Sequence, residues 1–192
     1  MPREPALRGQ PLVSLHQRLS GITMASMPTL TTHLYILRHA WAEELAAGID
    51  DHSRRLTKKG RKRFQKCVRR LCDAGMALDL VATSPLVRTR ETAEILSAEL
   101  PNSPPIIVVD ALAPGGDWQS LVEWTINQDA ARVAWVGHAP SVGRLVGLTI
   151  GDGRAAIRMQ KGAVASIRLD DGLGQPGELE WLATADMLAG EA

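Results

Sequence analysis

Hydrophobic residues along this chain occur in short continuous runs that alternate with segments of helical character. Runs with the length and composition of buried strands lie at about residues 33–38, 79–83, 106–109 and 132–137. Segments that favour helices lie between and after these runs, at about 57–73, 85–100, 117–127 and 139–149. In the second of these, Ser84 is a plausible N-cap and Pro85 suits the first helical position, which would place Arg88 about one turn into the helix. This alternation predicts an α/β fold, a three-layer sandwich in which helices flank a mostly parallel central sheet.

The C-terminal part of the chain changes character. Residues 163–169 and 178–183 read as strands, and they flank a glycine-rich turn at 171–177. Two strands joined by such a turn pair antiparallel, so the sequence predicts a C-terminal antiparallel hairpin at the end of the sheet.

The first 28 residues differ from the rest because they hold several prolines and show weak periodicity. We expect residues 1–28 to form a disordered or loosely docked extension, and residues 29–192 to form the single folded domain. Met24 and Met27 lie just before the first strand, so a later start codon is an open alternative. The apolar stretch in this extension is too short and broken for a signal peptide.

Composition indicates a soluble globular protein, with 45% hydrophobic and 22% charged residues. The net charge of +1 selects no partner by itself, and no apolar run approaches the length of a membrane span. Cys67 and Cys72 lie five residues apart on one expected helix, which gives neither a disulfide framework nor a zinc spacing. We therefore expect a cytoplasmic protein with no membrane partner.

Cations and imidazoles follow three of the expected strands. Arg38 and His39 end the first, Arg88 follows the second, and His138 follows the strand at 132–137. The carboxyl ends of parallel strands line the ligand crevice of an open α/β sheet, so these four side chains would meet in one pocket. Two of these motifs have plainer interpretations when taken singly. Arg38 and His39 could be a surface pair at a strand end, and His138 could be a core or capping histidine.

Three sequence blocks carry a resemblance to a known family. The segments LRHA (37–40), SPLVRTRETA (84–93) and VGHAP (136–140) resemble the signature blocks of the histidine phosphatase superfamily, which has the phosphoglycerate-mutase-like fold. The short chain and LTKKG (56–60) look most similar to its small bacterial branch, which dephosphorylates phosphohistidine on signalling proteins. One departure is Ala40, where the family usually has glycine; the motif survives if the backbone there needs no positive φ.

The resemblance assigns roles to the four residues. His39 would be the nucleophile that is transiently phosphorylated, Arg38 and Arg88 would bind phosphoryl oxygens, and His138 would contact the phosphate and stabilise the transition state. No metal or other cofactor is implied. The residue types suit this chemistry, because a neutral imidazole is a nucleophile and nearby guanidinium groups lower its pKa while they attract phosphate. One such cation about 4 Å from an anionic charge contributes about 4 kcal/mol at an effective dielectric of 20.

No proton donor can be chosen from the sequence. Where the wider superfamily has a glutamate after the third strand, this chain has Leu112-Ala113-Pro114. An alkoxide leaving group benefits strongly from an acid, whereas the P–N bond of phosphohistidine is intrinsically labile. Together with an open site, expected from the short loops, this favours a phosphohistidine-bearing protein as substrate. The acids nearby in sequence, any of which could equally be a solvated loop residue, are Glu43, Glu44, Asp51, Asp110 and Asp117.

Two alternatives to a protein phosphohistidine phosphatase stay open. One is a phosphatase of small phosphorylated metabolites, and the other is a non-catalytic phosphate-binding module.

A basic segment provides information about the partner, because residues Arg54 to Arg70 contain ten Lys or Arg and no acid. This segment indicates either a solvated face or steering of an acidic protein, and the lack of interleaved aromatics argues against nucleic acid. Trp41 is a candidate for the mouth of the pocket.

Overall fold

The computed structural model describes residues 30–48 and 50–190, so the expected extension at 1–28 lies outside the described residues. Six strands form one sheet in the order β3-β2-β4-β1-β5-β6. Their bounds are β1 His33–Arg38, β2 Leu80–Thr83, β3 Ile106–Val108, β4 Arg132–Gly137, β5 Val164–Arg168 and β6 Glu178–Ala183. The helices are α1 Lys58–Asp73, α2 Val87–Glu99, α3 Trp118–Ile126, α4 Ser141–Ile150 and α5 Ala185–Ala189, with short 3-10 turns η2 Asp51–Ser53 and η3 Asp110–Leu112.

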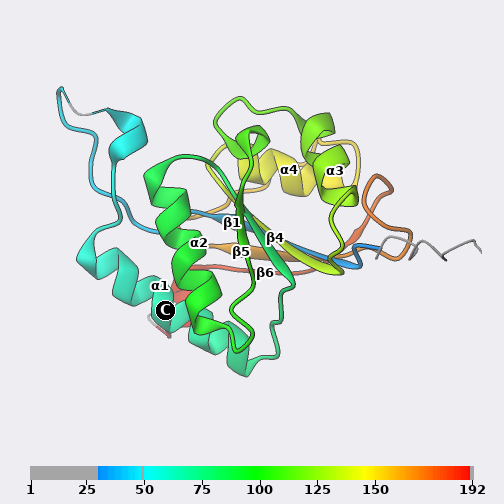
Figure 1. Ribbon diagram of the computed structural model, residues 1–192, viewed down its shortest axis with the longest axis horizontal. Coiled ribbons are helices and arrows are strands. Elements are labelled where there is room, and N and C mark those ends of the chain that lie inside the picture. Colours follow the sequence, from blue (N-terminus) through cyan, green and yellow to red (C-terminus); the bar gives the residue numbers. More distant parts are fainter. Residues whose placement is uncertain (1–29, 49, 191–192) are drawn as a thin grey trace, which may run out of the picture.

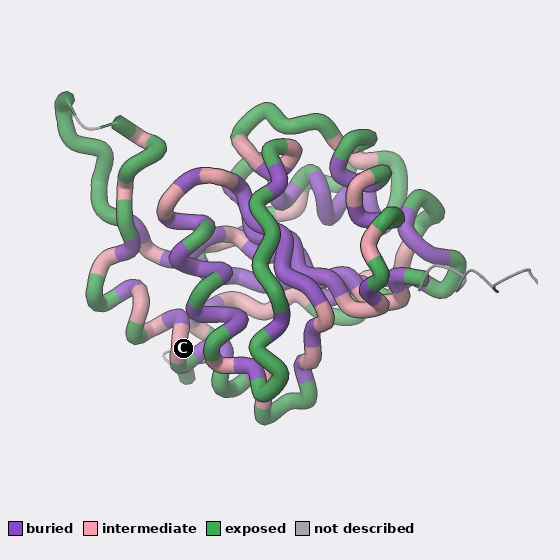
Figure 2. Tube along the Cα trace, in the orientation of Figure 1, coloured by how far each residue is buried: buried purple, intermediate pink, exposed green. Residues whose placement is uncertain are grey.

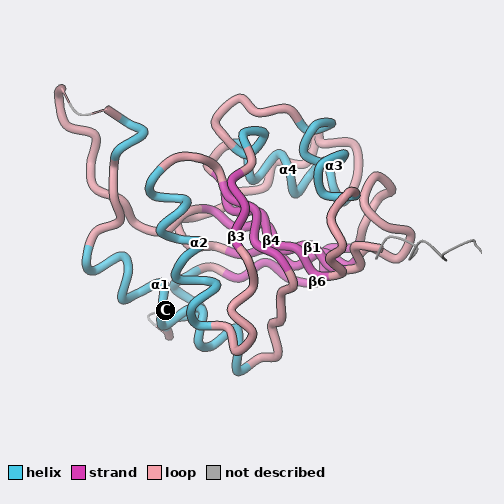
Figure 3. The backbone as a smooth tube through the Cα atoms, in the orientation of Figure 1, coloured by secondary structure: helices cyan, strands magenta, loops and turns pink. Residues whose placement is uncertain are grey.

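Helices cover both faces of the sheet. Helices α1 and α2 lie on one side of the strands, and α3 and α4 lie on the other (Figures 1 and 3). Strands β3, β2, β4 and β1 run parallel, β5 runs antiparallel to β1, and β6 runs antiparallel to β5. The predicted α/β sandwich with a C-terminal antiparallel hairpin is thus confirmed.

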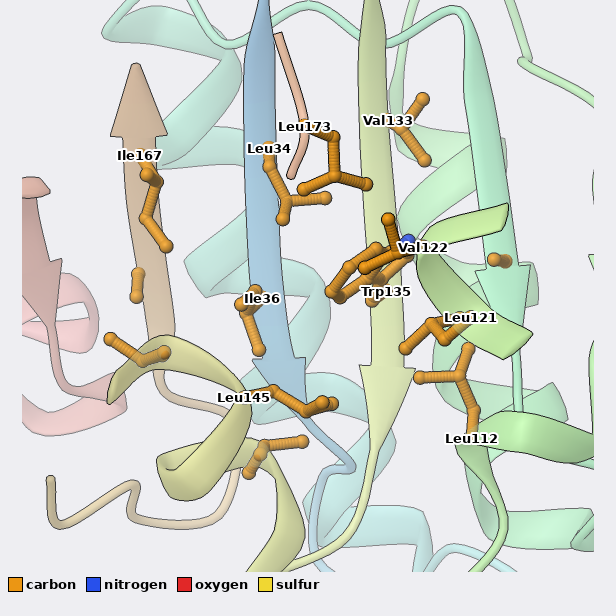
Figure 4. Close-up of a cluster of buried hydrophobic side chains, with 14 of the residues drawn as sticks. Leu34, Ile36, Leu112, Leu121, Val122, Val133, Trp135, Leu145, Ile167 and Leu173 are labelled. Carbon is orange, nitrogen blue, oxygen red and sulfur yellow. The ribbon is translucent and has the colours of Figure 1, made fainter. Parts of the chain in front are cut away.

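Alternate residues of the central strands serve two separate cores. Leu34 and Ile36 of β1 pack with Trp135 of β4 in the cluster beneath α3 and α4 (Figure 4). Tyr35 and Leu37 point the other way, into the cluster that α1 and α2 cover. Because successive side chains alternate across a strand, a parallel strand buried on both faces must be apolar at every position. This requirement explains the continuous hydrophobic runs in the sequence.

Helix α1 begins at Lys58, one residue later than predicted, because Thr57 is its N-cap. The Thr57 hydroxyl accepts a hydrogen bond from the Gly60 amide at 3.0 Å. Gly60 is packed so closely that an added Cβ would lie 2.4 Å from the carbonyl oxygen of Trp41. The predicted buried stripe is confirmed, and the opposite face of α1 is exposed (Figure 2). The four residues of the stripe are Phe64, Cys67, Val68 and Leu71.

Helix α2 starts later than the sequence predicts. The expected capping role of Ser84 and the placing of Pro85 in the first helical position are wrong, since Leu86 occupies the N-cap without a side-chain hydrogen bond. Arg88 is therefore the second residue of the helix, not one turn inside it. The reason is a competing partner, because the Ser84 hydroxyl is 2.9 Å from Nε2 of His138. The sequence reading also did not include η2, η3 and α5.

The ends of β1, β2 and β4 lie together because these strands are parallel and in register. Arg38 lies opposite Gly137, and Thr83 lies opposite Val136. The loop after β1 projects away from the sheet before it returns to α1 (Figure 1), and an isolated bridge joins Ala42 to Leu56 at its base. At the outer edge of the sheet, β3 exposes its three apolar residues. Within residues 30–48 and 50–190, no helix is long and apolar enough to span a membrane.

Candidate active site

The two histidines of the predicted site lie side by side at the ends of adjacent parallel strands. His39 follows β1 and His138 follows β4, and the His39 amide donates to the Gly137 carbonyl at 3.0 Å. Their ring centroids are 5.3 Å apart, and the ring planes are inclined by 57°. Both side chains are buried, with 6% of His39 and 4% of His138 exposed. The structure thus brings together two imidazoles that are 99 residues apart in sequence.

The two arginines complete this cluster. Arg38 is the last residue of β1 and donates to the Met159 carbonyl at 3.0 Å. Arg88, from the first turn of α2, donates to the Asp51 carbonyl at 2.7 Å and to its carboxylate at 2.9 Å. Both guanidinium groups lower the pKa of both imidazoles, so the cationic field reaches His39 and His138. All four predicted site residues therefore converge.

Three buried nitrogens of this cluster have no hydrogen-bond partner among the described residues. They are Nε of Arg38, Nε of Arg88 and Nδ1 of His138. Buried polar groups are almost always paired, and an unpaired one costs about 1–3 kcal/mol. The guanidinium groups to which two of these nitrogens belong are donors of the kind that bind the oxygens of a tetrahedral anion.

The ring of His39 is held in one tautomer. Its Nδ1 lies 2.7 Å from the carbonyl oxygen of Ala40. A carbonyl oxygen only accepts, so Nδ1 carries the proton and Nε2 keeps a free lone pair. Burial lowers the pKa of His39 to about 3, the Ala40 hydrogen bond opposes the shift, and His138, Arg88 and Arg38 add to it. His39 is therefore a neutral imidazole at neutral pH, with Nε2 available for bond formation.

His138 is also neutral at neutral pH. Burial, followed by the charge of Arg88, lowers its pKa to about 4. Its Nε2 lies 2.9 Å from the Ser84 hydroxyl, whereas its Nδ1 has no partner in the described part of the chain. Ser84 thus orients the second histidine, a contact that the sequence reading missed because the same residue resembled a helix cap.

Asp51 is the candidate acid whose carboxylate contacts an arginine of the cluster. Burial alone would raise the pKa of Asp51, but hydrogen bonds from Arg54 and Arg88 outweigh it and leave the pKa below its usual range. Asp51 is therefore an ionised acceptor, not a proton donor. Asp117 instead caps α3 by accepting from the Ser120 amide at 2.7 Å. Among the other acids considered from the sequence, Glu43 accepts from the Arg55 amide at 3.3 Å.

Thr92 is a site residue that the sequence reading missed. Its hydroxyl oxygen accepts a hydrogen bond from the Ala40 amide at 3.1 Å and donates to the Arg88 carbonyl at 2.6 Å. It thereby ties the residue that fixes the His39 tautomer to the helix that carries Arg88. Thr92 lies inside the SPLVRTRETA block, but a threonine within a helix has no pattern that marks such a contact. The backbone at residue 40 does not require glycine, because Ala40 does not have a positive φ. Among the described residues, Ser103 is the only non-glycine residue that does.

A cavity of about 480 Å³ opens beside the cluster and shares Arg38 with it. Trp41 lines this cavity, as the sequence suggested, and so do Ala139 and Pro140, which follow His138. The cavity therefore gives a ligand held by Arg38 room to extend beyond the cluster. Its other lining residues are Arg63, Gly143, Ile157, Arg158, Met159, Gln160, Lys161 and Asp186.

Comparison with known families agrees with this geometry. The sequence model of the histidine phosphatase superfamily (branch 1) matches residues 34–161, a range that contains all four clustered residues. The chain belongs to the histidine phosphatase superfamily. Within this superfamily, the predicted likeness to the small bacterial branch is confirmed by solved structures of SixA proteins.

Individual proteins resemble this chain to different extents. An uncharacterised protein of Picosynechococcus is 33% identical over 140 residues, covering 70% of this chain and 84% of its own length. The mitochondrial serine/threonine-protein phosphatase Pgam5 of Drosophila ananassae is 32% identical over 102 residues; the match covers 51% of this chain and 35% of Pgam5. The protein histidine phosphatase SixA, solved with tungstate, superposes with a TM-score of 0.70 at 26% identity, covering 80% of this chain and 97% of SixA.

Proposed function

We propose that this protein is a phosphatase that acts through a phosphohistidine intermediate and removes phosphate from phosphohistidine in a signalling protein. The family match and the phosphatases among its relatives support phosphatase activity. The observation that carries the mechanism is the hydrogen bond from Nδ1 of His39 to the Ala40 carbonyl, which leaves the lone pair on Nε2. His39 is our proposed nucleophile, Arg38 and Arg88 hold the phosphoryl oxygens, and His138 stabilises the transition state.

The proposed reaction has two displacements. In the first, the lone pair on Nε2 of His39 forms a bond to phosphorus while the P–N bond of the substrate breaks, and the leaving imidazole takes a proton from water. In the second, a water oxygen attacks phosphorus and the bond to Nε2 breaks. The proton that this water loses neutralises the hydroxide left by the first step, and phosphate and neutral His39 are released. Arg38 and Arg88 offset charge on the phosphoryl oxygens in both steps.

The absence of an evident acid among the described site residues favours phosphohistidine over an alkyl phosphate. Asp51 is ionised because its pKa is lowered, and His138 is neutral because its pKa is about 4, so neither offers a proton at neutral pH. A substrate with a labile P–N bond needs such a donor least. A reducing cytoplasm stays our prediction for the compartment.

The decisive experiment is to trap and map the phosphoenzyme. Phosphoramidate, a small P–N phosphoryl donor, should label the protein at His39, and the label should be acid-labile and base-stable. His39→Ala should abolish both label and turnover. The matched control is His33→Ala, at the opposite end of the same strand, which should keep both. Turnover by His39→Ala at the wild-type rate would exclude the mechanism.

The same assays separate the two alternatives. A clear preference for a small phosphomonoester over a phosphohistidine peptide would favour a metabolite phosphatase. Phosphate binding without any label on His39 would favour a non-catalytic binding module. Circular dichroism of each variant would verify that loss of activity is not loss of fold.

A further inference from the structure

The cavity beside Arg38 is strongly cationic. Arg38, Arg63, Arg158 and Lys161 line it, and Asp186 is the one carboxylate among its described lining residues. Arg158 and Lys161 are exposed, and neither forms an ion pair with an acid among the described residues. A group that continues from a phosphoryl held by Arg38 would therefore enter a positively charged space. This position favours a second anionic group on the substrate.

The cavity continues toward α1. The guanidinium of Arg63 stacks over the Trp41 ring at 4.4 Å from its centroid, and Arg63 also pairs with Asp186. A second cavity of about 170 Å³ lies against the same Trp41–Arg63 pair and is also lined by Lys59 and Gly60. Because both cavities share these two side chains, the surface leads from Arg38 to the first turn of α1.

The basic residues around α1 divide into two groups. Five of the six arginines between residues 54 and 70 form ion pairs with four acids of this chain, one of which pairs with two arginines, so their charge is partly compensated. The four lysines of this segment are exposed, and none forms an ion pair with an acid among the described residues. We call them the lysine face: Lys58, Lys59, Lys62 and Lys66.

The geometry of α1 places the lysine face on one side of the helix. At 3.6 residues per turn, the four lysines fall within an arc of about 100°, opposite the buried stripe. Arg63 borders this arc and is also the residue that lines both cavities. From Lys59 to Lys66 the helix rises about 10 Å. The uncompensated charge therefore extends well beyond the space that one phosphoryl group fills.

We propose that the cavity beside Arg38 and the lysine face of α1 form one docking surface for an acidic segment of the phosphorylated partner protein. This inference rests on the proposed function and adds the chemistry of the partner. A compact metabolite would fill only the cavity, whereas a chain that advances about 3.3 Å per residue reaches the lysines within a few residues. Such a surface raises the rate of encounter and selects acidic sequences.

The test compares three substrates. Two are short peptides that carry one phosphohistidine, flanked by glutamates in one and by glutamines in the other; the third is phosphoramidate. The wild-type protein should turn over the glutamate peptide with a higher kcat/KM than the glutamine peptide, by roughly three- to tenfold at low salt. The difference should vanish toward 1 M salt, where the screening length is about 3 Å.

Charge reversals locate the surface. Lys62→Glu and Lys161→Glu should each lower the ratio of kcat/KM for the glutamate peptide to that for phosphoramidate by about three- to tenfold. The matched control is Arg168→Glu, which makes the same change in net charge. Arg168 lies opposite His33, at the far end of the sheet from the cluster, so this ratio should not move.

Failure of the docking surface differs from failure of the proposed function. If phosphoramidate and both peptides are turned over but Lys62→Glu behaves like Arg168→Glu, the docking surface is refuted and the function stands. If the wild-type protein turns over none of the three substrates, the proposed function is refuted. The docking surface is then tested separately, by fluorescence anisotropy of labelled unphosphorylated peptides. The docking surface would be supported if the glutamate peptide bound more tightly than the glutamine peptide and Lys62→Glu abolished this difference. It would be refuted if both peptides bound equally, or if single-stranded DNA bound more tightly than the glutamate peptide.

Discussion

Replacement of Thr92 by valine tests how the nucleophile is positioned. Valine has nearly the same shape as threonine but lacks the hydroxyl that accepts from the Ala40 amide at 3.1 Å. The Ala40 carbonyl in turn accepts the Nδ1 proton of His39 at 2.7 Å. Thr92→Val should therefore loosen the backbone that fixes the ring of His39 while leaving every predicted chemical group in place.

The expected magnitudes follow from burial. Thr92 and Ala40 are both fully buried, so the Ala40 amide would lose its partner where water does not replace it. An unsatisfied buried amide costs about 1–3 kcal/mol, which sets the expected loss in the free energy of unfolding. Because a displacement of about 1 Å at a reacting group costs up to about 100-fold in rate, kcat should fall by roughly 10- to 100-fold.

The chain offers a matched control in Thr125. Its hydroxyl donates to the carbonyl four residues earlier, Leu121, at 2.8 Å, and accepts from the Trp135 indole at 3.1 Å. Thr125→Val should lose a similar free energy of unfolding in urea, because it too leaves one buried N–H unpaired. It lies on the buried face of α3, however, and contacts Trp135 and not the histidine cluster, so its kcat for phosphoramidate should match that of the wild-type protein.

Two results would refute this reasoning. If Thr92→Val and Thr125→Val lowered kcat equally, the loss would reflect general destabilisation and not the position of His39. If Thr92→Val kept the wild-type kcat and the wild-type rate of phosphoenzyme formation, the contact would have no role in positioning the nucleophile. A change in KM alone would count against the proposal in the same way.

Two further predictions concern pH and the carboxylate at Arg88. The pKa of His39 is about 3 and that of His138 about 4, so below the ordinary value of 6.5 the unfolded chain binds protons that the folded chain does not. Stability should be nearly full above about pH 7 and should fall by about 2 kcal/mol for each histidine between pH 7 and pH 5, measured by urea unfolding. A fall in His138→Gln equal to that of the wild-type protein would contradict this. Asp51→Asn should bind inorganic phosphate about two- to fivefold more tightly than the wild-type protein, measured by calorimetry, because a neutral amide competes less with phosphate for Arg88. Weaker binding would show instead that the carboxylate holds Arg88 in position for phosphate.

The strands and the clustered residues could be predicted because their signals are local. A strand buried on both faces must be apolar throughout, as in β1 and β4, and parallel strands necessarily bring their ends to one edge. This reasoning was sufficient to place Arg38, His39 and His138 together. Ala40 could also be judged in advance, because the only question was whether its φ is positive.

The supporting contacts could not be predicted because they depend on long-range packing. Ser84 has the local pattern of a helix cap, yet its hydroxyl contacts His138, 54 residues away. Asp51 is one of several loop acids in the sequence, and only the path of the loop brings it to Arg88, 37 residues away. Helix α5 is five residues long, too short for apolar periodicity to indicate it.

The close contact between Gly60 and Trp41 joins two parts of the molecule that otherwise look independent. Any side chain at residue 60 would collide with the Trp41 backbone, and the Thr57 amide also donates to the Trp41 carbonyl at 2.9 Å. The opening turn of α1 and the segment that immediately follows His39 are therefore packed directly against each other. A protein that binds at this end of the helix would contact a turn that rests on the backbone only two residues from the imidazole.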